Sequence, residues 1–380
     1  MSSPLQDAIP LGEVRRVLVT KLRHHGDVLL ASPVFAALAR AVPHAELDAL
    51  VYRETAPMLA NHPAIAAIHT IDRDWKRQGL ARQAGAEWSL LQTLRRRRYD
   101  LLVHLTEHPR GLTLAALLRP RYAVTRERTG DDDGGGPGRA SLWRRRFTHF
   151  YKVPRTPRHT VETNLDALRR IGIYPDVADR KLVLVPGDAA DTAVAARLAQ
   201  HGVATAPFVQ VHPGSRWMFK AWPAPRMSAL VDHVASRGFA VVVTGAPDAR
   251  ERTLAAETIG GCTAATRARI VDLTGALTLS ELAAVTARAR LFVGVDSAPM
   301  HIAAAMGTPA LALFGPSSEH VWGPWQVPHR IVASAAHPCR PCHLDGCGGG
   351  KVSDCLVRLP AQDAIDAFDA LLRETEGAAR

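Results

Sequence analysis

Residues 291–316, LFVGVDSAPMHIAAAMGTPALALFGP, decide the fold of this chain. The stretch begins with an apolar run that has the length and branching of a buried strand. Asp296 and Ser297 interrupt the run just before apolar side chains recur at helical spacing over Met300–Met306. A second apolar run follows at 310–314. The pattern predicts a βαβ unit whose polar turn lies at the carboxyl end of a strand, where open α/β sheets bind ligands.

The polar turn suits a phosphate or a ribose hydroxyl. The first amides of a helix lack internal partners and carry a partial positive charge. Asp296 and Ser297 are also common N-cap residues, and His301 lies one turn further along the helix. His301 is interpreted either as a structural residue or as a donor to phosphate. Asp248, in the turn GAPD at 245–248, is a weaker candidate for binding ribose hydroxyls, since this sequence is also an ordinary turn.

Length and composition predict a globular chain with two cores. The 380 residues fit two domains at roughly 150 residues per domain. The chain is 47% hydrophobic with a mean hydropathy of -0.04, and no apolar run approaches the ~18 residues of a membrane helix. The N-terminus lacks a basic segment followed by an apolar core, so no secretory signal is expected. We therefore expect a cytoplasmic protein.

The charge balance favours an anionic partner. Lys and Arg number 47 against 36 Asp and Glu, a formal net charge of +11, and the excess includes arginine runs at 95–98 and 144–146. A solvated basic surface is the alternative, because such runs commonly coat exposed helices. No nucleic-acid partner is expected, since no zinc finger, helix-turn-helix or RNP-type aromatic pattern accompanies the charge. A phosphorylated substrate or an anionic membrane surface fits it.

Short strands and helices alternate along the chain, which predicts parallel sheets with right-handed crossovers. The predicted strands are 16–20, 47–51, 64–71, 101–105, 208–211, 240–244, 269–273, 291–293 and 310–314. The predicted helices include 28–38, 161–171, 227–236, 251–259, 279–289 and 361–372, and the Gly-rich residues 129–139 are expected to form a surface loop. The domains are placed at 1–186 and 207–355, with a linker at 187–206 and a C-terminal segment, 356–380, whose helix packs back on the first domain.

Asp27 is the candidate general base. It follows the first strand, in KLRHHGDVLL at residues 21–30, at the start of the next helix. A carboxylate here either caps the helix or accepts a proton from a substrate hydroxyl. Helix-start amides lower the pKa of a carboxylate, so a base at this position requires a well-aligned hydroxyl.

Residues 212–223, HPGSRWMFKAWP, form the candidate diphosphate clamp. Gly214 and Ser215 follow a strand and can offer amides and a hydroxyl to phosphate oxygens, while Lys220 carries a compact positive charge that Arg216 can share. A surface loop with an aromatic cluster is the alternative. The clamp is favoured because a diphosphate leaving group requires charge neutralisation and the sequence offers no acidic constellation for Mg²⁺.

Four of the five cysteines lie in one segment with the spacing C-x2-C-x4-C-x7-C. Four thiolates satisfy tetrahedral zinc, and a reducing cytosol discourages disulfides, so a structural zinc site is one interpretation. Free or redox-active thiols are the other, because the x4 and x7 spacings match no standard zinc knuckle. The residues concerned are Cys339, Cys342, Cys347 and Cys355.

Two segments, RRVLVTKLRHHGDVLLASPVFAALARAVPHAELDALV at 15–51 and GVDSAPMHIAAAMGTPALALFGPSSEHVWGPW at 294–325, together resemble the lipopolysaccharide core heptosyltransferases, glycosyltransferase family nine. KLRHHGDVLL and the cysteine segment HPCRPCHLDGCGGGKVSDCL at 337–356 are most similar to the heptosyltransferase III branch. The resemblance extends over about residues 14–372. It implies the α/β GT-B fold, in which two Rossmann-like domains face each other across a cleft, with acceptor on the first and ADP-L-glycero-D-manno-heptose on the second.

The resemblance also implies the reaction and its residues. It implies an inverting transfer in which an acceptor heptose hydroxyl attacks the anomeric carbon and ADP leaves, with no cofactor required for catalysis. Asp27 matches the family's proposed base, and Lys220 matches its diphosphate lysine. The other donor-binding candidates are Ser215, Arg216, Asp248, Leu277, Asp296, Ser297, Ala298 and His301. The acceptor-binding candidates are Arg23, His24, His25 and Arg53.

One departure concerns the turn after Asp296. Ser297 and Ala298 stand where the family commonly has Thr-Gly, and alanine has less backbone freedom than glycine. The implied acceptor is a phosphorylated lipopolysaccharide core on the cytoplasmic face of the inner membrane, so we expect peripheral electrostatic attachment without insertion.

Two alternatives belong to other classes. A nucleotide-sugar epimerase shares the two-domain cleft and isomerises a sugar without an acceptor. A catalytically inert nucleotide-sugar or lipopolysaccharide binding subunit binds the donor without turnover. The presence of both Asp27 and Lys220 favours the transferase.

Overall fold

A computed structural model of the chain describes residues 7–106, 108–127 and 143–377 and divides the chain into two compact units, Met1–Val183 and Leu184–Arg380. Each unit is built on a six-stranded parallel sheet with helices on its faces. The loop predicted at 129–139 lies outside the described residues. Among the residues that are described, no helix combines the length and the apolar character needed to cross a membrane.

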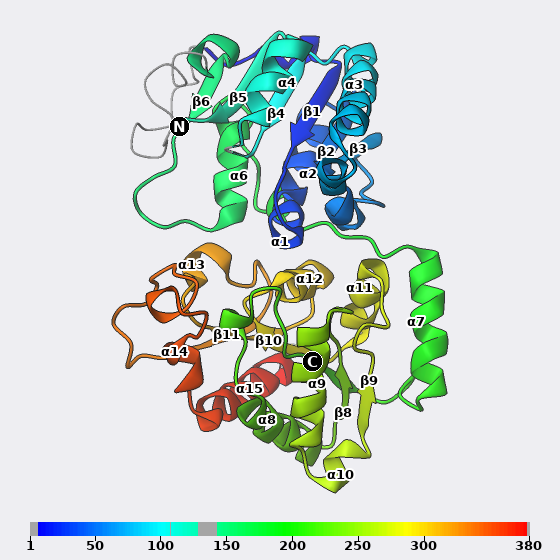
Figure 1. Cartoon of the computed structure of the whole chain (residues 1–380), viewed down its shortest axis with the longest axis vertical. Coiled ribbons are helices and arrows are strands. Elements are labelled where there is room, and N and C mark those ends of the chain that lie inside the picture. Colours follow the sequence, from blue (N-terminus) through cyan, green and yellow to red (C-terminus); the bar gives the residue numbers. More distant parts are fainter. Residues whose placement is uncertain (1–6, 107, 128–142, 378–380) are drawn as a thin grey trace. The chain divides into compact units, whose positions relative to one another are not determined.

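The first unit contains the sheet β3-β2-β1-β4-β5-β6, and Figure 1 shows the strands in this order. Its strands are β1 (Arg16–Thr20), β2 (Glu46–Tyr52), β3 (Ala67–Ile71), β4 (Leu101–His104), β5 (Tyr122–Arg126) and β6 (His149–Tyr151). Its α-helices include α1 (His25–Leu29), α2 (Ser32–Ala41), α3 (Leu80–Arg97), α4 (Arg110–Leu118) and α6 (Thr160–Arg169), and its short 3₁₀ turns include η1 (Leu11–Glu13), η2 (Arg53–Met58), η3 (Arg73–Arg77) and η5 (Ala178–Arg180).

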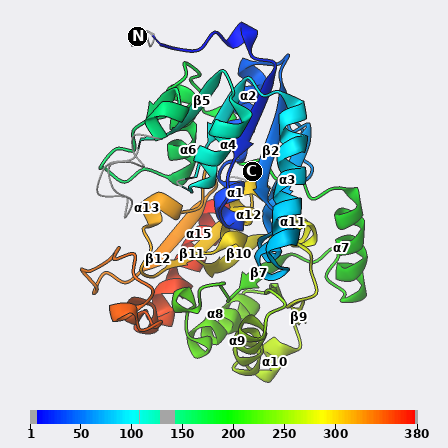
Figure 2. The ribbon, with the colours of Figure 1, turned by 45° about the horizontal axis from the view of Figure 1, so that its top comes forward.

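The second unit repeats this topology with the order β12-β11-β10-β7-β8-β9, and Figure 2 labels β12, β11, β10 and β7 next to one another in this order. Its strands are β7 (Phe208–His212), β8 (Ala240–Val243), β9 (Ile270–Asp272), β10 (Leu291–Val295), β11 (Ala310–Phe314) and β12 (His329–Ala333). Its helices include α7 (Asp188–Gln200), α8 (Ala224–Ser236), α9 (Ala249–Gly260), α10 (Ala264–Arg267), α11 (Leu279–Arg288), α12 (Ala298–Met306), α13 (Glu319–Trp322), α14 (Asp354–Val357) and α15 (Ala361–Gly377), and its 3₁₀ turns include η6 (Met218–Lys220) and η7 (Cys347–Gly349).

Both sheets contain a point at which the strand order reverses. In each sheet the chain starts in the middle, moves out to one edge, and then returns to build the other side. The order therefore reverses between β1 and β4 in the first unit and between β7 and β10 in the second. Open α/β sheets bind ligands at such topological switch points, outside the carboxyl ends of the strands.

The predicted βαβ unit is confirmed. The strand predicted at 310–314 has the bounds of β11, and the strand predicted at 16–20 has those of β1. The helix predicted at 28–38 is interrupted, because α1 ends at Leu29 and α2 starts at Ser32. Pro33 explains the interruption, since proline lacks an amide hydrogen and favours the first turn of a helix over its interior.

The predicted linker at 187–206 is wrong, because most of it is the helix α7. Its side chains Ala190, Val194 and Leu198 are buried in the second unit's core. On its outer side Arg288 Nη1 donates to Asp191 Oδ1 at 2.7 Å, which joins α7 to α11. The Ala-rich composition that suggested a linker is equally that of a good helix former.

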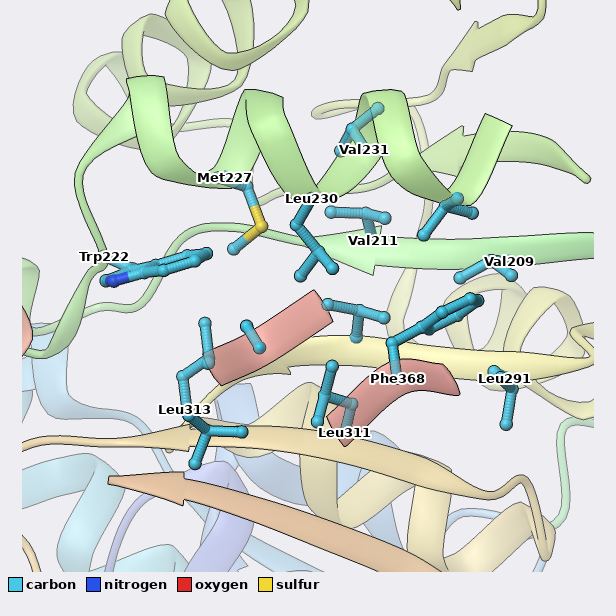
Figure 3. Close-up of a cluster of buried hydrophobic side chains, with 14 of the residues drawn as sticks. Val209, Val211, Trp222, Met227, Leu230, Val231, Leu291, Leu311, Leu313 and Phe368 are labelled. Carbon is cyan, nitrogen blue, oxygen red and sulfur yellow. The ribbon is translucent and has the colours of Figure 1, made fainter. Parts of the chain in front are cut away.

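The C-terminal helix also differs from the prediction that it packs on the first domain. α15 packs against α8, β11 and β12 of the second unit. Figure 3 shows Phe368 of α15 among the apolar side chains of this core, near Leu291 and Leu311. Trp222, fully buried in the same core, donates its indole hydrogen to the Leu359 carbonyl at 3.2 Å. The segment after residue 356 therefore belongs to the second unit.

A buried ion pair stabilises the first unit by joining β2 to the end of α3. Asp48 on β2 is fully buried and accepts from Arg97 Nε at 2.8 Å, from Arg97 Nη2 at 2.9 Å and from the Tyr99 hydroxyl at 2.6 Å. Burial raises the pKa of Asp48, but the hydrogen bonds from His69, Arg97 and Tyr99 outweigh it and lower this pKa to about 2. The carboxylate is therefore charged and satisfied at neutral pH.

Asp48→Ala is expected to destabilise the first unit by about 3–5 kcal/mol, because it leaves the Arg97 guanidinium without its buried partner. Because the folded pKa lies below the ordinary value, the stabilisation is fully present above the unfolded pKa and is lost as the pH falls through the folded value. Urea unfolding of wild type and variant therefore gives a midpoint difference that is constant near neutral pH and shrinks between about pH 4 and pH 2. Asp176→Ala, at an exposed ion pair, is the control. An equal effect of both substitutions contradicts the prediction.

Candidate functional site

Lys220 and Asp296 join the two predicted donor motifs of the second unit. β7 and β10 are neighbouring parallel strands, so the loop after His212 and the turn after Val295 lie at the same edge of the sheet. Lys220 Nζ donates to Asp296 Oδ2 at 2.6 Å. The Asp296 side chain is 6% exposed and that of Lys220 is 21% exposed. The pair therefore stands at the switch point, and the ammonium group can still be reached by a ligand.

The N-terminus of α12 borders this ion pair. Ser297 occupies the N-cap position, but its hydroxyl donates to the Val295 carbonyl at 3.3 Å and forms no capping hydrogen bond. Pro299 has no amide hydrogen and the Met300 amide donates to the Ser297 carbonyl at 3.1 Å, so this nine-residue helix offers an anion its Ala298 amide and the positive end of its dipole. Ala298 is the first helical residue and has an ordinary negative φ, so alanine meets no strain where the family commonly has glycine. His301 is buried in α12.

The loop after β7 is held in shape by its own side chains. Ser215 is buried, and its Oγ accepts from the Trp217 amide at 3.3 Å. Arg216 is exposed, with its guanidinium 5.5 Å from the centre of the Trp217 ring. Ser215 thus shapes the turn, and Arg216 offers a charge at its surface. Direct contact of either residue with a donor stays a prediction.

Asp248 and Glu251, the first two acidic residues after β8, make different contacts. Asp248 is the N-cap of α9 and accepts from the Arg250 amide at 3.1 Å, so the structure uses it as a cap and its ribose contact stays a prediction. Glu251 is the buried acid of this loop. Its Oε2 accepts from the Ala246 amide at 2.8 Å and lies 3.4 Å from His212 Nε2.

Glu251 supports two of the loops at the switch-point edge, although sequence reasoning missed it. A Cβ added to Gly214 would lie 2.7 Å from its carboxylate, so the loop after β7 passes directly over it. The signal in the sequence was D-x-x-E from Asp248 to Glu251, the spacing of a capping box. The carboxylate contacts Ala246 and His212 instead of completing that box.

Glu251→Ala is expected to cost about 1–3 kcal/mol in stability, because it leaves a buried amide and a buried histidine without their acceptor. Burial raises the pKa of Glu251, but His212 and the hydrogen bond from the Ala246 amide together lower it by more. The net shift of this pKa is therefore downward. The stabilisation is present above the unfolded pKa and is lost as the pH falls through the lowered folded value. Thermal unfolding at several pH values measures the effect, with Glu257→Ala, an exposed position on the same helix, as the control. A pH-independent loss contradicts the charge-based explanation.

Leu277 lies just before α11 and is partly buried against the core cluster that contains Phe208 and Val242. An apolar side chain at this place is compatible with the predicted packing against adenine, which stays a prediction.

In the first unit, the loop after β1 is tied to the loop after β4 across the other switch point. Lys21 is buried, and its Nζ donates to the Leu105 carbonyl at 3.1 Å and to Asn164 Oδ1 at 3.0 Å. The Leu22 amide donates to Thr106 Oγ1 at 2.9 Å. Lys21 was not among the predicted site residues. Its ammonium group fixes the start of the segment that carries Asp27.

Asp27 lies within the first turn of α1, and His24 occupies the N-cap position, so the interpretation of Asp27 as the N-cap is wrong. The Asp27 side chain is 13% exposed, and its Oδ1 lies 3.7 Å from Arg23 Nε. Asp27 is therefore a largely buried carboxylate next to a cation, at the edge of the sheet where ligands bind. The structure leaves a role as base open, and that role stays a prediction.

The other acceptor candidates surround this turn. His25 Nε2 lies 2.8 Å from the Glu54 carbonyl, which connects α1 to η2. Arg53 opens η2, is 65% exposed, and pairs with Asp72 at 3.1 Å. Arg23 is 57% exposed. Arg23 and Arg53 can meet an anionic acceptor, whereas His25 has a structural contact of its own.

The four cysteines of the segment 339–355 are free thiols in the structure. Among the described residues, which include all four thiols, no group of three or more His, Cys, Asp and Glu side chains is placed to hold a metal ion. Cys339 and Cys347 are exposed, whereas Cys355 is buried, and burial raises the pKa of its thiol. The segment is attached through Arg340, whose Nε donates to the Gly315 carbonyl at 2.6 Å. Zinc binding by these four thiols stays a prediction.

Comparison with known proteins agrees with this arrangement. The model of glycosyltransferase family 9 (heptosyltransferase) matches residues 87–352. Lipopolysaccharide heptosyltransferase 3 from Escherichia coli is 33% identical over 92% of this chain and 97% of its own length.

Two solved structures share the fold. The glycosyl transferase family 9 protein from Veillonella parvula has a TM-score of 0.80 at 21% identity, covering 97% of this chain and all of its own. The E. coli heptosyltransferase WaaC, solved with ADP, has a TM-score of 0.66 at 18% identity, covering 94% of this chain and 99% of its own. The two parallel sheets are thus those of a GT-B glycosyltransferase, and the fold prediction is confirmed. By this match over most of its length, the chain belongs to glycosyltransferase family 9, the heptosyltransferases.

Proposed function

We propose that the chain transfers L-glycero-D-manno-heptose from ADP-heptose to a heptose of the lipopolysaccharide inner core, with inversion at the anomeric carbon. The observation that carries the proposal is the Lys220–Asp296 pair beside the α12 N-terminus, because it brings a cation together with the Ala298 amide and the positive end of the helix dipole, a combination that suits a diphosphate. The related WaaC has been solved with ADP-2-deoxy-2-fluoro heptose, which supports this choice of donor. The match to heptosyltransferase 3 supports the choice of acceptor.

The donor residues neutralise the leaving group. As the bond between the anomeric carbon and the diphosphate oxygen breaks, negative charge grows on that diphosphate. Lys220 Nζ, the Ala298 amide and the positive end of the α12 dipole then interact more strongly with the leaving group than with the intact donor, which is the condition for lowering the barrier. Asp296 orients the ammonium group through its 2.6 Å contact, and Arg216 adds a second positive charge.

Asp27 acts on the acceptor. Its carboxylate accepts the proton of the acceptor hydroxyl while the hydroxyl oxygen forms the new bond to the anomeric carbon. Attack from the face opposite to the leaving ADP is a single displacement, and it inverts the configuration at that carbon. Arg23 and Arg53 bind the acceptor's phosphates, so the acceptor is held by charge and its hydroxyl is aligned by Asp27. The proton ends on Asp27 and the negative charge ends on ADP.

The test mixes the purified full chain with ADP-heptose and a core acceptor that lacks the terminal heptose. We expect release of ADP, a product heavier by one heptose in mass spectrometry, and an inverted anomeric configuration in NMR. Turnover is expected to persist in a chelator, since Lys220 and the positive end of the α12 dipole neutralise the diphosphate. Isomerisation of the sugar without acceptor would identify an epimerase, and donor binding by calorimetry without turnover on any core acceptor would identify a binding subunit. Retention of configuration would contradict the single displacement.

The site of action follows from the acceptor. A lipopolysaccharide core is carried by a lipid, so we infer that the enzyme works at the cytoplasmic face of the inner membrane. Mass spectrometry of core oligosaccharide from cells that lack this chain tests both points, because a missing heptose identifies the sugar that is transferred and its position. An unchanged core oligosaccharide contradicts the proposal.

A further inference from the structure

Three helical segments cover one face of the first unit's sheet. Leu94 of α3, Ala115 of α4 and Trp143 at the start of a short helix over 143–146 lie in the same apolar cluster as Leu18 and Leu102 of the sheet. We call this surface the α3–α4 face, and both named helices can be found in Figure 1. The proposed transferase reaction makes no use of it.

An apolar cavity of about 340 Å³ opens between α3 and α4. Leu91 and Leu94 line it from α3, and Leu114 and Leu117 line it from α4. Trp88 also lines the cavity although it is 59% exposed, and Leu117 is 39% exposed. This volume is within the range of small-ligand pockets. A cavity with exposed apolar side chains at its edge is typical of a contact with a membrane or with another protein.

Among the described residues of the α3–α4 face, exposed positive charges outnumber negative ones. The exposed arginines of the α3–α4 face are Arg82, Arg95, Arg96, Arg98, Arg144, Arg145 and Arg146. Glu87 is the acidic residue of α3, and it already pairs with Arg110 of α4 at 2.7 Å. Arg144, Arg145 and Arg146 directly follow Trp143 of this face, and Arg95, Arg96 and Arg98 lie at the C-terminal end of α3, where Arg97 pairs with Asp48. A membrane surface with anionic headgroups offers the complementary charge, at about 1 kcal/mol per arginine near the surface.

We propose that the α3–α4 face docks on an anionic lipid bilayer, with one lipid acyl chain entering the cavity beside Trp88 while the arginines contact the headgroups. Tryptophan favours the membrane interface because its ring is apolar and its N–H is polar. A second copy of the chain is disfavoured as the occupant, because docking like faces brings the arginines of both copies together. The sequence alone predicted that the protein attaches to the membrane by charge, without insertion. The cavity extends this prediction, because it can take up a lipid acyl chain.

This inference extends the proposed function, since it places the enzyme on the membrane that holds the acceptor, but its test uses no turnover. The two proposals can therefore fail independently. Sedimentation of the full chain with vesicles of phosphatidylcholine, with and without phosphatidylglycerol, measures the binding. We expect binding to vesicles that contain phosphatidylglycerol and a decrease as salt is added.

The arginine contribution is tested by R144Q/R145Q/R146Q, which is expected to weaken vesicle binding about 100-fold. R237Q/R330Q/R373Q removes the same number of positive charges from exposed positions of the second unit and is expected to leave binding within about twofold. If both triple variants lose binding equally, net charge explains the attachment and the assignment to this face is overturned.

The cavity is tested by Trp88. W88S is expected to weaken binding at least about tenfold, because a large apolar side chain no longer leaves water. Y174S, at an exposed aromatic residue of the same unit, is expected to have no effect. Vesicles with dibrominated acyl chains are expected to quench part of the tryptophan fluorescence of the wild type, and W88F is expected to lose that part. Because Trp88 is largely exposed, circular dichroism is expected to show that both Trp88 variants are folded.

Three results overturn the proposal. The first is vesicle binding with no quenching by brominated chains, which limits the contact to headgroups. The second is a change in Trp88 fluorescence that follows protein concentration in the absence of lipid, which assigns the cavity to a second copy. The third is binding that W88S leaves unchanged.

Discussion

Asp27→Asn is expected to lower kcat by about 10²–10⁴-fold, the range for loss of a general base. The amide keeps the size of the carboxylate, so the contact with Arg23 at the start of α1 weakens without a change of shape. The acceptor hydroxyl keeps its position and loses the group that takes its proton. Steady-state kinetics with saturating ADP-heptose measure this, and KM for the donor is expected to stay within about threefold because the proposed donor residues lie in the second unit.

Two controls make the Asp27 result specific. Asp74→Asn removes an exposed carboxylate at the same edge of the sheet and is expected to leave kcat unchanged. Asp27→Glu keeps the charge but displaces it by one methylene, so we expect an intermediate rate. Full turnover by Asp27→Asn would remove Asp27 from the mechanism, whatever the controls show.

Lys220→Met is expected to lower kcat/KM by about 10²–10³-fold, because the growing charge on the diphosphate loses its cation. The same change leaves the buried Asp296 carboxylate without its partner, which is expected to destabilise the second unit by about 3–5 kcal/mol. Activity and stability therefore fall together in this variant. Kinetics and urea unfolding are needed side by side.

The double variant Lys220→Met/Asp296→Asn separates the two losses. It removes the unpaired charge, so most of the stability is expected to return while turnover stays low. Arg330→Met, which breaks an exposed Arg–Glu pair in the same unit, is the matched control and is expected to change neither quantity. Recovery of turnover in the double variant would show that Lys220 acts through stability rather than on the leaving group.

Much of the fold was predictable because buried parallel strands leave a strong signal. Their continuous apolar runs, as at 310–314 and 16–20, are bounded by turn residues, and the alternation of strands with helices determines the parallel order. α3, α4 and α7 were harder, because their sequences are rich in Arg or Ala and resemble exposed or linking segments. β12 was missed because its first residues, His329 and Arg330, are polar and exposed at the edge of the sheet.

The candidate site was predictable in its motifs and less so in its contacts. The motifs around Lys220 and Asp296 each follow a predicted strand, so their meeting at one sheet edge follows from the topology. The role of Glu251 depends on the direction in which its own side chain points from the first turn of α9. The D-x-x-E spacing from Asp248 to Glu251 is that of a capping box and does not reveal this direction. The buried contacts of Lys21 with Leu105 and Asn164 join segments far apart in the sequence, so no local pattern reveals them.

The membership of α15 in the second unit has a consequence for how such enzymes diversify. Because the C-terminal helix stays with its own core, the chain passes from one unit to the other between Val183 and Leu184 and does not return. A single recombination event at that junction exchanges a complete half. Chimeras can thus combine the half of one transferase that we propose to recognise the nucleotide with the half of another that we propose to select the receiving sugar, and each parental core is inherited intact.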